Sequence, residues 1–71
     1  MTRSHESQAP LTDAVVQLTG SDGNAFSIIA RVRVAIRRSN HPELGDAFMN
    51  EAISGDYDHV LVTCLRYVTV E

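Results

Sequence analysis

The sequence predicts a small α+β domain in the order strand, helix, helix, helix, strand, in which the two end strands form a short two-stranded sheet. Three observations lead to this fold class. The chain has 71 residues, which is enough for one domain. Segments rich in β-branched residues lie near both ends, at 14–20 and 66–71. Between them, apolar residues recur in three segments at the three- and four-residue spacing of a helix.

The first residues of the chain show no hydrophobic period. They are polar and carry Pro10, so we predict a disordered tail at 1–12 and a single domain at 13–71. The segment AVVQLTG, at 14–20, predicts the first strand. No stretch approaches the roughly 18 consecutive apolar residues of a membrane span, and a single cysteine suits a reducing compartment. We therefore expect a soluble cytoplasmic protein.

The segment 25–39 fits two periods. Its alternation of arginine with valine would suit a strand in a hairpin, and this alternative stays open. As a helix, the segment gathers its apolar residues into one stripe and leaves every arginine outside it, which accounts for more residues. We expect a helix that is capped by Asp22 or Asn24 and stopped by Asn40 and Pro42. The stripe consists of Ala25, Ile28, Ile29, Val32, Ala35 and Ile36.

Two further helices are expected. The segment PELGDAFMNEAIS predicts one that has Pro42 at its first position and Gly55 as a left-handed residue after its end. Its buried side would hold Leu44, Ala47, Phe48 and Ala52. The next helix would begin near Tyr57 with Asp56 as its cap, and would lead into the strand at 66–71. Its buried side would hold Tyr57, Val60, Leu61, Cys64, Leu65 and Val68.

Catalytic and metal chemistry find little support in the sequence. Cys64 lies on the apolar stripe of the last helix, where a thiol behaves as a small hydrophobic group with a raised pKa. Asp56 and Asp58 suit the start of that helix, which explains them without a metal site beside His59. We therefore predict no catalytic residue, no metal, no cofactor and no enzymatic activity.

The arginines offer a candidate anion site. All six cationic side chains are arginine, and four of them lie at 31–38. Together with the glycine-bearing turn at 20–24 they could bind a phosphate, because a helix N-terminus favours negative charge. Asp22 opposes such a site, so the turn is expected to start a helix and any anion site to need an assembled oligomer. The candidate ligand-binding residues are Ser21, Gly23, Asn24, Arg31, Arg33, Arg37 and Arg38.

The same helix offers a candidate interface. Phe26 and Val34 lie outside its buried stripe and beside arginines, and aromatic residues and arginine are enriched in protein interfaces. A core this small seldom suffices without a staple, a metal or a partner. We therefore expect a homo-oligomer, most simply a dimer, with an interface at Phe26, Val34, Arg33 and Arg37. A complementary acidic surface would come from Glu43, Asp46 and Glu51.

Two stretches carry a resemblance, LTGSDGNAFSIIARVRVAIRR and SGDYDHVLVTCLRYVTVE. Between roughly residues 14 and 70, the chain resembles a family of small proteins from bacterial, phage and mobile-element genomes. That family is marked by an Asp-Gly-Asn-Ala-Phe turn and a Gly-Asp-Tyr-Asp motif. The resemblance implies an accessory gene of mobile DNA whose product lies in the bacterial host cytoplasm, and it assigns no site residue.

Three functions are compatible with these features. The first is a non-catalytic interaction protein, a phage or mobile-element accessory that binds a host protein. The second is an oligomer that sequesters a phosphorylated nucleotide signal in an anti-defence role. A nucleic-acid-associated protein is the third, and the absence of lysine and the net charge of −3 disfavour it.

Overall fold

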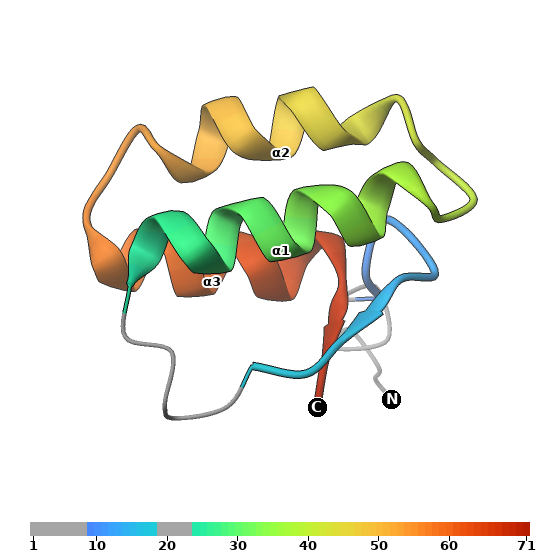
Figure 1. Cartoon of the computed structure of the whole chain (residues 1–71), viewed down its shortest axis with the longest axis horizontal. Coiled ribbons are helices and arrows are strands. Elements are labelled where there is room, and N and C mark those ends of the chain that lie inside the picture. Colours follow the sequence, from blue (N-terminus) through green and yellow to red (C-terminus); the bar gives the residue numbers. More distant parts are fainter. Residues whose placement is uncertain (1–8, 19–23) are drawn as a thin grey trace, which may run out of the picture.

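The computed structural model of the chain describes residues 9–18 and 24–71. It confirms the predicted α+β domain, with three helices and a two-stranded sheet formed by the strands nearest the two ends of the chain (Figure 1). The elements are β1 (Val15–Val16), α1 (Ala25–Arg37), α2 (Leu44–Ala52), α3 (Tyr57–Tyr67) and β2 (Thr69–Val70). Helices α1 and α2 lie side by side, and α3 packs against both of them (Figure 1).

Helix α1 settles the choice between the two periods in its segment. The predicted stripe faces the core, with Ile28, Ile29, Val32 and Ile36 buried. The Asn24 side chain accepts a hydrogen bond from the Phe26 amide at 2.9 Å, so Asn24 is the cap. The other candidate cap, Asp22, lies outside the described residues.

Helix α2 begins later than predicted and ends differently. Pro42 and Glu43 form a turn before it, in which the Gly45 amide donates to the Pro42 carbonyl at 3.2 Å. No described residue has a positive φ, so the prediction that Gly55 is a left-handed cap is wrong. The helix instead ends with the Ile53 amide donating to the Met49 carbonyl at 3.1 Å. Ala47 is exposed, contrary to the prediction, whereas Met49 is half-buried and packs against the core.

Helix α3 starts at Tyr57 as predicted, and the Asp56 carboxylate accepts from the His59 amide at 3.0 Å. Its buried side is rotated from the predicted stripe. Thr63 and Tyr67 are buried, whereas Tyr57 and Leu65 are exposed. Thr63 can be buried because its hydroxyl donates to the His59 carbonyl at 2.7 Å. The Tyr67 ring stands edge-on to Phe48, with ring centres 5.4 Å apart, at the centre of the core.

The sheet is parallel and pairs Val15 with Thr69 and Val16 with Val70. Pairing with the C-terminal part of the chain extends before β1. The amides of Leu11 and Thr12 donate to the carbonyls of Arg66 and Tyr67 at 3.1 and 3.0 Å, and Thr12 is buried. The packed domain therefore includes Leu11 and Thr12, so the boundary predicted at 13 lies too late, and the rest of the predicted tail up to residue 8 lies outside the described residues.

Candidate functional site

Two of the four clustered arginines are engaged within the chain. Arg31 donates to the Gln17 carbonyl, beside β1, at 3.2 Å. Arg33 lies on the other flank of α1, where its guanidinium binds Asp46 of α2 at 2.7 Å. The hydrogen bond and the positive charge of Arg33 lower the pKa of the Asp46 carboxyl. The predicted arrangement of arginines on opposite flanks is present, but these two side chains already have protein partners.

The other two arginines lie near the C-terminal end of α1. The stem of Arg37 packs over Gly45, where a side-chain carbon would lie 2.9 Å from the Arg37 Cγ. Arg38 is exposed just after the helix, and its amide donates back to the last turn. The basic end of α1 thus carries Arg37 and Arg38.

The glycine-bearing turn of the candidate anion site is only partly described. Ser21 and Gly23 lie outside the described residues. Asn24 is described, and its side chain already accepts from the Phe26 amide, one of the donors that an anion at this helix N-terminus would use. Asn24 therefore acts as a cap in this structure.

The single cysteine lies in the hydrophobic core. Cys64 is fully buried, and burial raises the pKa of its thiol from 9.0 to about 11. A thiol with that pKa is protonated at neutral pH and is a poor nucleophile. Among the described residues, no group of three or more His, Cys, Asp and Glu side chains could hold a metal ion.

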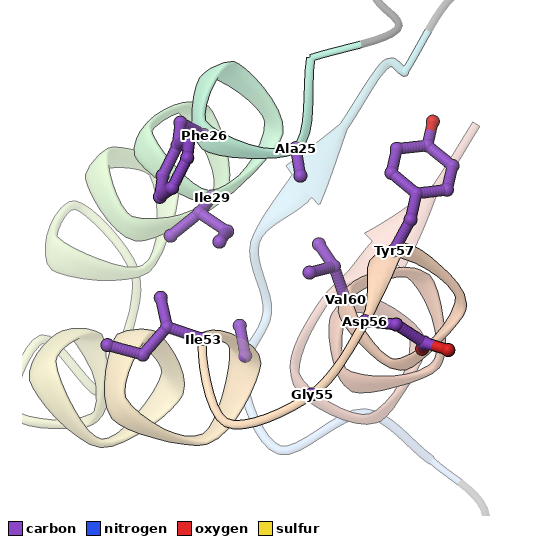
Figure 2. Close-up of a pocket in the computed structure, with 9 residues that line it drawn as sticks. Ala25, Phe26, Ile29, Ile53, Gly55, Asp56, Tyr57 and Val60 are labelled. Atoms are coloured by element: carbon purple, nitrogen blue, oxygen red, sulfur yellow. The ribbon is translucent and has the colours of Figure 1, made fainter.

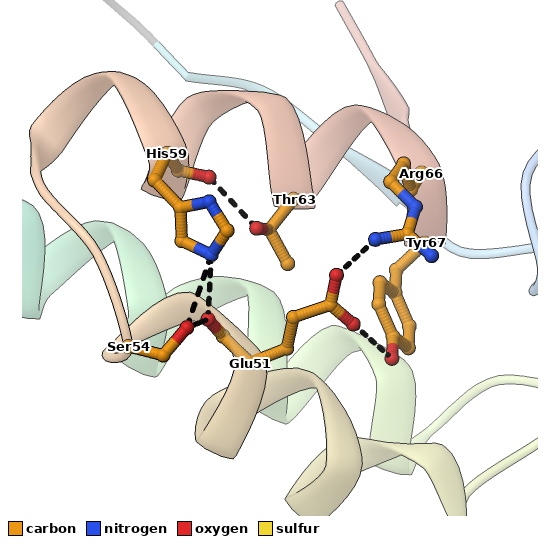
Figure 3. Close-up of polar contacts among 6 residues, drawn as sticks. All are labelled: Glu51, Ser54, His59, Thr63, Arg66 and Tyr67. Carbon is orange, nitrogen blue, oxygen red and sulfur yellow. Dashed lines mark hydrogen bonds and ion pairs between the residues drawn. The ribbon is translucent and has the colours of Figure 1, made fainter.

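A polar cluster joins α2 to α3 (Figure 3). One oxygen of the Glu51 carboxylate accepts from the Tyr67 hydroxyl at 3.0 Å, and the other pairs with Arg66. The His59 imidazole contacts the Glu51 carbonyl at 2.8 Å, and because a carbonyl only accepts, the imidazole Nε2 donates. Burial, followed by the bond to Glu51, raises the pKa of the Tyr67 hydroxyl. The cluster satisfies polar groups at a helix end, which is a structural role.

The acidic residues that were expected to form a surface for a partner are paired within the chain. Asp46 and Glu51 bind arginines of their own chain, and Glu43 contacts His41 at 3.1 Å. The hydrogen bond from its own backbone, then that from His41, lowers the pKa of Glu43. The three acidic residues named from the sequence are thus engaged internally, and they do not form an unpaired surface for a partner.

An apolar cavity opens where the ends of the three helices meet (Figure 2). Its volume is about 180 Å³. Ala25 and Ile29 of α1, Ala52 of α2 and Val60 of α3 supply much of its lining. Three large apolar side chains that also line it are solvent-exposed: Phe26 by 75%, Ile53 by 53% and Tyr57 by 42%. We call this cavity, with its exposed Phe26, Ile53 and Tyr57, the Phe26 surface.

No protein-family model, curated protein or solved structure matches this chain. The family resemblance of the sequence therefore stays a prediction. In the part of the chain that the structure describes, no helix has the length and apolar character needed to cross a membrane.

The candidate site combines residues that the sequence singled out with others that it did not. Phe26 and Val34 are exposed on α1, by 75% and 48%, as an interface would require. Ile53 and Tyr57 were not singled out, since Ile53 follows a helix end and Tyr57 was assigned to a buried stripe. The sequence signal that could have identified them is the Gly55–Asp56 break between α2 and α3. This break places Ile53 just after the end of α2 and Tyr57 at the start of α3.

Proposed function

We propose that this chain is a non-catalytic interaction protein that binds another polypeptide through the Phe26 surface. The observation that carries the proposal is the exposure of Phe26, by 75%, at the mouth of an apolar cavity. Contiguous exposed apolar patches are typical of protein interaction sites, and Phe26 belongs to such a patch together with Ile53 and Tyr57. A host protein, as the family resemblance implies, and a second copy of this chain both belong to this partner class.

The size of the cavity suits one apolar side chain and is too small for a ligand as large as a nucleotide. Small-molecule sites usually have roughly 300–1,000 Å³. The cavity here has about 180 Å³. An apolar cavity of about 150 Å³ is known to hold a benzene molecule, so one apolar side chain of a partner would fill this one.

The nucleotide alternative has weaker support from the described residues. Arg31 and Arg33, two of its four candidate cations, already bind the Gln17 carbonyl and Asp46. Phosphate recognition by either guanidinium would have to break that bond. The nucleic-acid alternative is disfavoured by the overall charge of −3, because nucleic-acid binding depends on neutralising phosphates.

The proposal is tested by site-specific photo-crosslinking in cells that produce the protein. Phe26 is replaced by p-benzoylphenylalanine, and a matched control carries the same group at Val62, which is 57% exposed on α3, away from the cavity. We expect a covalent adduct with a polypeptide from position 26 and none from position 62. Adducts from neither position, or equally from both, would contradict the proposal.

A second experiment, on the purified chain, tests the nucleotide alternative. A thermal shift with cyclic and linear nucleotides should leave the melting temperature unchanged, because Arg31 and Arg33 already have partners within the chain. A ligand present at about 100 times its dissociation constant would add roughly 2.7 kcal/mol to the free energy of unfolding. A shift of that size, without an adduct from position 26, would contradict the proposed protein binding and support nucleotide binding.

A further inference from the structure

We draw no further inference here: the strongest candidate, the exposed apolar row that Phe26, Ala30 and Val34 form along the outer side of α1, carries no proposal, because nothing in the part of the chain that the structure describes shows what covers it.

Discussion

Gly55→Ala should destabilise the domain, even though the backbone at Gly55 does not require glycine. A Cβ at this position would lie 2.6 Å from Cγ and 2.8 Å from Cδ2 of His59. That ring cannot give way at no cost, because its Nε2 donates to the Glu51 carbonyl at 2.8 Å. Moving the ring forfeits a hydrogen bond worth about 0.5–1.5 kcal/mol, and the crowding adds a comparable amount. We expect the free energy of unfolding to fall by about 1–3 kcal/mol.

The sign of this effect should reverse once the imidazole is removed. In a His59→Gly background, the added methyl group meets neither the ring nor the Cβ of residue 59, which would otherwise lie 2.7 Å away, and the φ of Gly55 is not positive. Gly55→Ala should then raise the free energy of unfolding by about 0.4–1 kcal/mol, because alanine restricts the unfolded chain. The assay is urea unfolding of the four chains of this double-mutant cycle at one protein concentration. Equal effects of Gly55→Ala in both backgrounds would refute the steric reasoning.

Three other predictions concern the core and the N-terminal pairing. Phe48→Ala removes a fully buried ring and should cost about 3–5 kcal/mol in urea unfolding, while Val62→Ala, at a site 57% exposed, should change stability by no more than about 0.5 kcal/mol. Burial raises the pKa of Cys64 from 9.0 to about 11, so the folded chain holds the thiol proton more tightly than the unfolded chain. The stability that this provides is complete below pH 9 and is lost between pH 9 and about 11, by at most about 3 kcal/mol. A Cys64→Ala variant should lack this loss. Thr12→Val removes a hydroxyl that donates to the Tyr67 carbonyl at 2.7 Å and accepts from the Ala14 amide, and should cost about 1–2 kcal/mol; an unchanged urea midpoint would show that these bonds contribute nothing.

The helices could be predicted because their periodicity is local information. Ile28, Ile29, Val32 and Ile36 identify the buried side of α1, and Asn24 identifies its start. The buried side of α3 was harder to predict, because two of its buried residues, Thr63 and Tyr67, carry polar hydroxyl groups and depend on hydrogen bonds. Tyr67 can be buried because its hydroxyl donates a hydrogen bond to the Glu51 carboxylate, 16 positions away in the chain. Such a long-range partner leaves no trace in the spacing of apolar residues.

The Phe26 surface could be predicted only in part for a similar reason. The exposure of Phe26 follows from its place outside the stripe of one helix, which periodicity shows. The cavity beside it depends on how closely the ends of three helices approach, and Ile53 and Tyr57 join it from segments that look unrelated to Phe26. The contacts of Arg31 with Gln17 and of Arg33 with Asp46 could not be predicted either, because they depend on tertiary packing.

The pairing of the two ends of the chain has a consequence for the order of folding. Thr12 and Tyr67 meet although they are 55 positions apart, whereas each helix closes through contacts within one segment. Bringing β1 and β2 together closes a long loop, which is slow and gains few contacts until the helices have packed. The two strands should therefore pair after the rate-limiting step of folding. Substitutions at Thr69 or Val70 should then accelerate unfolding and leave the refolding rate nearly unchanged, whereas substitutions at Ile29 or Phe48 should slow refolding.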